Sequence, residues 1–248
     1  MIDIKNLSFS YSTKKVLDDI SFIGNNGDII AILGQNGAGK STLLKCLNGI
    51  LKPNSGSILI DSKNILDLSS NEKAKLLSYV PQDIMFGDFC IFDAVLMGRK
   101  PYIKFDSSNE DLKITSDILK KFNLEDMALN NVNEISGGER QKVAIARTLA
   151  QDSSIILFDE PTSNLDLKNQ LSTISMIKEI VKNNKIAIIT MHDLNMAMRL
   201  ANKFLFLKDN KIYAFGNENI ITKKLVKDIY EIDVEIVRLN NHKTIIIK

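Results

Sequence analysis

The chain has 248 residues, of which 44% are hydrophobic and 25% are charged, close to the averages for soluble globular proteins. Its 32 Lys and Arg residues nearly balance its 30 Asp and Glu residues. The resulting net charge of +2 gives no electrostatic reason to expect nucleic acid or an anionic membrane surface as the main partner. The two cysteines, Cys46 and Cys90, are far apart in the sequence, which excludes a disulfide framework or a zinc site as the organising principle.

The apolar runs are too short for a membrane-spanning helix. The longest, at 29–33 and 155–158, fall far below the roughly 20 residues that cross a bilayer. The first residues lack the basic and then apolar profile of a signal peptide. The sequence therefore predicts a soluble protein of one large domain, or two intimate ones, that stays in the compartment where it is made.

The first third of the chain has the patterns of a strand, a helix and a second strand. A continuous apolar run at 28–33 ends at Gly34 and predicts a buried strand. Leucines and isoleucines at helical spacing follow within 43–51, and 56–61 is a second strand after a Pro-Asn-Ser-Gly turn. From about 69 to 131 the chain has fewer strand runs and more Lys and Asp, so we expect a mostly helical insertion there.

Strand and helix patterns alternate after this insertion. An apolar run at 153–158, an amphipathic stripe at 167–181 and a third apolar run at 185–190 imply a parallel sheet covered by helices on both faces. The tail returns to β patterns, with one strand pair at 204–215 and another at 235–247. The second pair encloses Asn240-Asn241, a plausible two-residue hairpin turn.

A phosphate-binding loop lies between the first buried strand and the first helix. It matches the pattern G-x-x-x-x-G-K-[ST] through Gly34, Gln35, Asn36, Gly37, Ala38, Gly39, Lys40 and Ser41. Its glycines let backbone N–H groups turn toward a phosphate, and the helix N-terminus adds partial positive charge. Lys40 is expected to reach the β- and γ-phosphates and the Ser41 hydroxyl to bind Mg²⁺. The alternative is a chance match, which the strand–loop–helix context disfavours.

Two carboxylates end the strand pattern at 153–158. Ligands bind at the carboxyl edge of a parallel sheet, so Asp159 is placed to hold Mg²⁺ and Glu160 to polarise an attacking water. The alternative is an exposed acidic turn.

A second helix start carries two glycines. Ser136 and Glu139 have the spacing of a capping box, which is the structural interpretation. Gly137 and Gly138 between them leave the backbone bare at a helix N-terminus, which favours a second anion site.

Taken together, these motifs resemble the ATP-binding cassette ATPase of an ABC transporter over nearly the whole chain. The motifs that carry the resemblance are the phosphate loop, Ser78-Tyr79-Val80-Pro81-Gln82, Ile135-Ser136-Gly137-Gly138-Glu139-Arg140-Gln141, Phe158-Asp159-Glu160-Pro161, Ser163-Asn164-Leu165-Asp166 and Thr190-Met191-His192-Asp193. Ile135 replaces the usual leucine of that family, a change with little effect on volume. The resemblance implies an α/β fold: a P-loop core with a mostly parallel sheet, an antiparallel β subdomain and a helical insertion. It divides the single domain into a core at 1–80 and 152–248 and a helical part at 82–150.

The resemblance also implies residue roles. Tyr11 would stack on adenine, and Thr42 would join the loop in binding ATP. Gln82 would contact Mg²⁺ and sense the membrane partner, and His192 would hold the γ-phosphate and the attacking water. In a second, head-to-tail copy of the chain, Ser136, Gly137, Gly138 and Glu139 would cover the γ-phosphate, and Asp166 would cross the interface.

The implied partners are a second ATPase subunit, a polytopic permease and, indirectly, an extracytoplasmic substrate-binding protein, with no nucleic acid. The implied place is the cytoplasmic face of the inner cell membrane. The segments Met97–Tyr102 and His192–Ala197 are most similar to importers of iron–siderophore, haem and cobalamin complexes. Zinc, manganese or molybdate import stays open. So do a cassette protein without a transport role and a regulatory module without turnover.

Two further features have alternative interpretations. The apolar residues Met85, Phe86, Phe89, Ile91 and Phe92 form either part of a docking groove for a permease helix or the core of the helical insertion. His242 is expected to be an ordinary exposed residue of the terminal hairpin.

Overall fold

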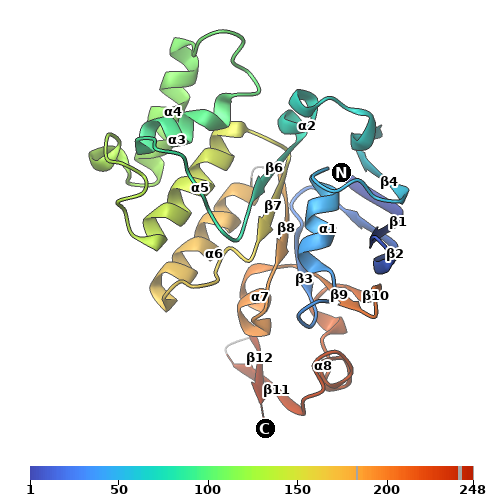
Figure 1. Cartoon of the computed structure of the whole chain (residues 1–248). Coiled ribbons are helices and arrows are strands. Elements are labelled where there is room, and N and C mark those ends of the chain that lie inside the picture. Colours follow the sequence, from blue (N-terminus) through green and yellow to red (C-terminus); the bar gives the residue numbers. More distant parts are fainter. Residues whose placement is uncertain (183, 240–241, 248) are drawn as a thin grey trace.

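A six-stranded sheet forms the centre of the protein in the computed structural model, which describes residues 1–182, 184–239 and 242–247 (Figure 1). Its strand order is β10-β9-β3-β8-β7-β6, and all neighbours are parallel except β9 and β10. The strands are β3 (Ile29–Leu33), β6 (Leu77–Val80), β7 (Ile155–Asp159), β8 (Ile186–Thr190), β9 (Lys203–Lys208) and β10 (Lys211–Gly216). The predicted strands at 28–33, 153–158 and 185–190 and the first tail pair are confirmed.

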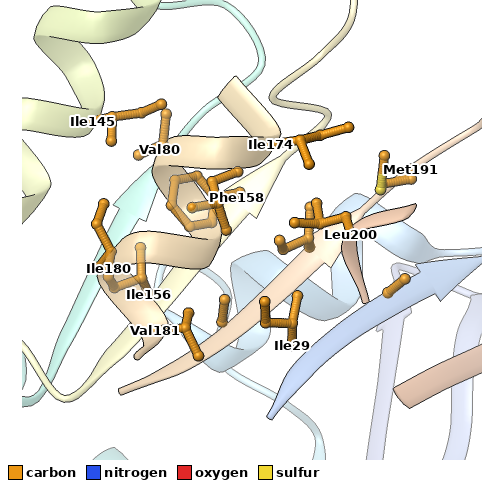
Figure 2. Close-up of a cluster of buried hydrophobic side chains, with 14 of the residues drawn as sticks. Ile29, Val80, Ile145, Ile156, Phe158, Ile174, Ile180, Val181, Met191 and Leu200 are labelled. Carbon is orange, nitrogen blue, oxygen red and sulfur yellow. The ribbon is translucent and has the colours of Figure 1, made fainter. Parts of the chain in front are cut away.

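Alternate residues of each central strand enter two different hydrophobic cores. On β3, Ile29 packs in the core under the helices, whereas Ile30 packs in the core under the antiparallel sheet. Figure 2 shows part of the first core, where Phe158 and Ile174 lie among other buried side chains. Because both faces are covered, the strands read as continuous apolar runs rather than as alternating ones.

A four-stranded antiparallel sheet and one helix cover the second face. The sheet has the order β2-β1-β4-β5, and the helix α1 carries the buried residues Leu43, Leu44 and Leu47 of that core. The elements are β1 (Ile2–Tyr11), β2 (Lys14–Gly24), α1 (Lys40–Leu47), β4 (Ser55–Ile60) and β5 (Lys63–Asn64). The sequence predicts a helix on this face, and in the structure a complete second sheet covers the face together with that helix.

The other face is covered by helices. They are α3 (Ile91–Leu96), α4 (Asn109–Lys121), α5 (Gly137–Gln151), α6 (Leu167–Val181), α7 (Leu194–Leu200) and α8 (Lys223–Tyr230), and α2 (Ser70–Leu76) precedes β6. A short helical turn, Met97–Arg99, follows α3. The stretch from 69 to 131 is mostly helical as predicted, except for β6, which pairs with β7 at the edge of the central sheet. Its four residues are too few to show a strand pattern among helices.

The tail ends in a two-stranded sheet, β11 (Val234–Leu239) and β12 (His242–Ile247), near the C-terminus in Figure 1. This confirms the second predicted strand pair. The predicted turn at Asn240-Asn241 lies outside the described residues, as does the side chain of His242. Within the part of the chain that the structure describes, none of the helices combines the length and apolar composition that crossing a bilayer requires.

A buried ion pair joins α4 to the segment after α3. Arg99 Nε donates to Asp111 Oδ1 at 2.9 Å, and Arg99 Nη1 donates to the carbonyl of Ala150 at 2.9 Å. The Tyr102 ring lies 4.1 Å from the guanidinium carbon. A Cβ on the neighbouring Gly98 would come within 2.2 Å of the Arg147 carbonyl, so only glycine allows this close approach to α5. The segment Met97–Tyr102 therefore has a structural role in the helical insertion.

Replacing Arg99 by methionine is expected to lower the free energy of unfolding by about 3 kcal/mol, because it leaves a buried carboxylate and a buried carbonyl without this partner. Chemical denaturation measures the change. The matched control is Lys182→Met, which breaks an exposed ion pair with Glu179 and should leave the free energy of unfolding nearly unchanged. Equal effects of the two substitutions would contradict the structural role of Arg99.

Candidate nucleotide-binding site

The phosphate loop leaves β3 at Gly34 and enters α1 at Lys40. A Cβ on Gly34 would lie 2.5 Å from the Leu207 carbonyl of β9, so the strand neighbour excludes any side chain there. Gly39 is the N-cap of α1 with φ of +96°, a conformation that favours glycine. The sequence pattern is therefore explained by local geometry at both ends of the loop.

Lys40 is buried within its own loop. Its Nζ donates to the carbonyls of Gly34 and Gln35 at 2.9 and 3.0 Å, and the residue is only 5% exposed. Burial lowers the pKa of Lys40, while the nearby carboxylates of Glu160 and Asp159 act in the opposite direction. An anion at the loop would therefore meet a largely desolvated ammonium group that two loop carbonyls already orient.

Asp159 is the centre of a hydrogen-bond cluster at the carboxyl edge of the sheet. Its Oδ1 accepts from Ser41 Oγ at 2.9 Å and from Thr190 Oγ1 at 2.6 Å, and its Oδ2 accepts from the Tyr79 hydroxyl at 3.2 Å. Burial and the carboxylate of Asp159 both raise the pKa of Tyr79, which keeps its hydroxyl a donor. The ends of β6, β7 and β8 bring these groups together because the strands are parallel neighbours.

Glu160 follows directly and is held on both carboxylate oxygens. Gln82 Nε2 donates to its Oε2 at 2.9 Å, and His192 Nε2 contacts its Oε1. Its backbone has φ of +51°, and its N–H donates to Thr190 Oγ1 at 2.9 Å. The conformation turns the side chain of Glu160 away from the strand and toward Gln82 and His192, the two residues that the sequence predicts beside it.

A cleft of about 340 Å³ opens above the phosphate loop. Its predicted lining residues are Tyr11, Asn36, Gly37, Gly39, Lys40, Ser41, Thr42, Glu160 and His192. Tyr11 is the last residue of β1, 47% exposed, and its ring packs edge-on against Phe9 at 4.8 Å. Gln35 and Ala38 complete the loop, with Gln35 exposed and Ala38 half-buried.

Sequence reasoning missed two groups of residues at the site. Lys14, Lys15, Val16 and Asn210 also line the cleft, and Tyr79 and Thr190 hold Asp159. The two lysines near Tyr11 carried one signal, a pair of cations beside a predicted phosphate site. The hydroxyls of Tyr79 and Thr190 carried none, because single polar residues at strand ends are common.

The second glycine pair lies outside this cleft. Ser136 is the N-cap of α5 and forms the predicted capping box with Glu139, whose Oε2 accepts from Ser136 N at 2.9 Å. The hydrogen bonds from the Ser136 hydroxyl and from its backbone N–H hold the pKa of Glu139 below its ordinary value. A Cβ on Gly138 would meet the Asn169 side chain at 2.6 Å, whereas a Cβ on Gly137 would have nothing within 4 Å. The fold therefore requires a small residue at 138 but not at 137.

Asp166 lies next to this helix start rather than in the cleft. It is the N-cap of α6, and its Oδ1 and Oδ2 accept from the backbone and side-chain nitrogens of Asn169 at 2.8 and 3.0 Å. Asn169 is also the residue against which Gly138 packs. Ser136, Gly137 and Asp166 are exposed, so one copy of the chain presents them together as a surface separate from its own phosphate loop.

A phosphate loop after a central strand, with acidic residues at the end of a neighbouring parallel strand, defines a P-loop nucleotide hydrolase. The family model for ABC transporters matches residues 17–163, and the chain belongs to the ABC transporter family as an ATP-binding ATPase.

Curated relatives cover almost the whole chain. An uncharacterized ABC transporter ATP-binding protein of Methanocaldococcus jannaschii is 49% identical over 95% of this chain and 93% of its own. An ATP-binding protein of Helicobacter pylori assigned to iron chelatin transport is 37% identical over 97% of each chain. A haemin import ATP-binding protein of Thermobifida fusca is 33% identical over 96% of this chain and 84% of its own. A phosphonates import ATP-binding protein of Fusobacterium nucleatum is 36% identical over 93% of this chain and 98% of its own.

Solved structures share the fold over the same span. A transporter assigned to the metal-chelate type, in an inward-facing conformation, has a chain with a TM-score of 0.85 and 31% identity over 100% of this chain and 98% of its own. A dimeric cassette in a post-hydrolysis state, bound to ADP and phosphate, has a TM-score of 0.77 and 28% identity over 88% of this chain and 98% of its own.

Proposed function

We propose that this chain is the ATP-hydrolysing subunit of an importer and that it works as a head-to-tail homodimer on a membrane permease. The observation that carries the proposal is the separation, on one chain, of the phosphate-loop cleft from a second helix start that bears an exposed glycine. The cleft holds Lys40 and Glu160, whereas Ser136 and Gly137 are exposed outside it. Each surface is incomplete alone, and a second copy supplies the other. The dimeric cassette bound to ADP and phosphate supports this arrangement.

The residues of the cleft fit a Mg²⁺ ion with ATP. Ser41 and Asp159 bring a hydroxyl and a carboxylate within 2.9 Å of each other, and Gln82 adds an amide beside Glu160. Such oxygen donors are the ligands that Mg²⁺ prefers, so these three residues would hold it. The ion neutralises charge on the β- and γ-phosphates when it is bound. Lys40 exchanges its carbonyl contacts for phosphate oxygens, and Tyr11 stacks on the adenine.

The chemistry follows from Glu160 and His192. Phosphoryl transfer to water requires in-line positioning and charge stabilisation rather than a covalent intermediate. Glu160 orients the water and accepts its proton, and His192 donates a hydrogen bond toward the γ-phosphate. Ser136 and the backbone at 137–139 of the second copy complete the other side. ATP therefore holds two copies together, and hydrolysis releases them.

An exposed apolar groove in the helical insertion supports a permease as the membrane partner. A groove of about 260 Å³ is lined by Phe89, Met97, Phe105 and neighbours, and Phe105 is fully exposed. Of the residues expected to form a docking groove, Phe89 and Met85 are exposed, while Phe86 and Phe92 are half-buried against the core. Ile91 follows the alternative interpretation, because its side chain faces inward on the first turn of α3 and lies in the core.

The proposed cargo is a metal–chelate complex, such as an iron–siderophore, haem or cobalamin. The relatives named for iron chelatin and haemin and the metal-chelate type structure support this class. The relative named for phosphonates import has a sequence identity similar to theirs, so the experiment also includes other cargoes. The proposed place of this chain is the cytoplasmic face of the inner membrane, bound to the permease. An extracytoplasmic binding protein would deliver the cargo to the permease on the opposite side.

The test is purification of the tagged chain from native membranes, with identification of bound proteins by mass spectrometry. A polytopic permease is the expected partner. Vesicles that contain the complex, oriented so that their lumen corresponds to the cytoplasm, should accumulate ⁵⁵Fe-siderophore only when ATP is present in the lumen. Accumulation of phosphonate or free zinc instead would contradict the proposed cargo class but not the proposed importer function. Recovery of ribosomes or DNA in place of a permease would overturn the transport function itself.

A further inference from the structure

The loop that presents His192 is fixed by the first turn of α7. His192 lies between the end of β8 and the start of α7, two residues before Leu194. Asp193 caps that helix, because its Oδ1 accepts from Met196 N at 3.0 Å. A displacement of this first turn would therefore move His192 relative to Glu160.

One side chain ties this turn to the C-terminal hairpin. Asn195 Nδ2 donates to the carbonyl of Ile245 at 3.0 Å, and the Ile245 N–H donates to Asn195 Oδ1 at 2.8 Å. Ile245 pairs with Ile236 across the two-stranded sheet, so its other backbone edge faces α7. The side-chain amide of Asn195 bonds to both the N–H and the carbonyl of Ile245, as a third strand would.

The hairpin itself is anchored to the body of the protein. Ile245 is 7% exposed and Val234 is 4% exposed, and both belong to the core under the helices. Lys243 Nζ donates to the Glu218 carbonyl at 2.8 Å, and Lys223 forms an ion pair with Glu235. Asn195 is therefore bonded to a support that is held from several sides.

We infer that Asn195 is a positioning residue for His192: it bonds α7 to β12 so that the His192 loop is held against Glu160. This rests on the proposed catalytic role of His192. Only an amide provides a donor and an acceptor in this geometry, since a carboxylate lacks the N–H and a hydrocarbon lacks both. Asn195 itself is not among the residues that line the cleft, so it acts through the loop.

The test uses the full chain with Asn195→Asp, which keeps the acceptor for the Ile245 N–H but places a carboxylate oxygen against its carbonyl. The sequence has two histidines, so a His242→Gln background leaves His192 as the single imidazole signal in ¹H–¹³C spectra. The expected result is a changed and broadened His192 resonance. The expected kcat for ATP falls roughly tenfold while KM stays unchanged, because the nucleotide contacts are intact. Asn195→Ala removes both bonds without adding charge and is expected to give the same change, and Asn195→Gln should restore part of the activity.

Asn202→Asp is the matched control. Asn202 makes an equivalent pair of bonds past the other end of α7, accepting from Ile29 N at 2.9 Å and donating to the Gly27 carbonyl at 3.1 Å. It should lower thermal stability without moving the His192 resonance. An unchanged resonance in both Asn195→Asp and Asn195→Ala, or an equal change in Asn202→Asp, would overturn the inference. Wild-type hydrolysis by His192→Ala would instead overturn the proposed role of His192, and the resonance would still decide whether Asn195 holds the loop.

Discussion

Replacing Glu160 by glutamine is expected to preserve ATP binding and to slow ATP hydrolysis by at least about 100-fold. The amide keeps the shape of the side chain but accepts a proton poorly. The hydrogen bonds that Lys40 forms with a loop carbonyl and that Asp159 forms with Ser41 are untouched. The affinity for ATP should therefore stay the same or increase, because the substitution removes one negative charge near the γ-phosphate. Single-turnover hydrolysis and equilibrium binding of a fluorescent ATP analogue measure the two effects separately.

The slow variant should also accumulate as an ATP-dependent dimer, because the step that separates the copies is blocked. Light scattering with and without ATP measures this. Glu179→Gln is the control, since that carboxylate forms an exposed ion pair with Lys182 and does not line the cleft. A single-turnover rate equal to that of the unmodified chain would remove Glu160 from its proposed role.

Replacing Gly137 by leucine is expected to lower ATPase activity roughly 100-fold while leaving the fold intact. A Cβ at this position has nothing within 4 Å among the described residues, and the residue is helical, so the free energy of unfolding should stay or rise by about 0.5–1 kcal/mol. In the proposed dimer the same side chain would occupy the place of the γ-phosphate. Steady-state hydrolysis, thermal unfolding and light scattering with ATP measure the outcome.

The matched control is Asn109→Leu. Asn109 is the first residue of α4, which has the same kind of capping box as α5, with Ser108 and Asp111 in place of Ser136 and Glu139. It should leave hydrolysis and ATP-induced association unchanged. Gly138→Leu is expected to destabilise the chain, because that position packs against Asn169. ATP-dependent dimers of the Gly137→Leu variant would contradict the proposed contact.

The parts of the fold that the sequence predicted are those with local causes. The buried strands β3, β7 and β8 are continuous apolar runs because both faces of the sheet are covered. The phosphate loop was predictable because a single turn requires glycines and a lysine at a fixed spacing. The short strand β6 was missed, since its identity depends on pairing with β7 rather than on its own residues.

The motifs of the candidate site could be predicted from the sequence, but the residues that hold the site residues in place could not. Asp159 and Glu160 follow a greasy strand and so attract attention, but Tyr79 and Thr190 reach Asp159 only because parallel strands end at one edge. The bond from Asn195 to Ile245 joins residues 50 positions apart. No local pattern indicates such contacts, because they arise from the register of the folded chain.

The two bonds on Glu160 have a consequence for timing. One oxygen faces His192 on the loop before α7, and the other accepts from Gln82 on the linker into the helical insertion. The carboxylate proposed to react is thus held by two separate segments of the chain. In the proposed importer, a shift of the linker that withdraws Gln82 would free an oxygen of Glu160 to take a proton from water. A permease pressing on the helical insertion would then set when the bond to phosphorus breaks, independently of how tightly the nucleotide is held.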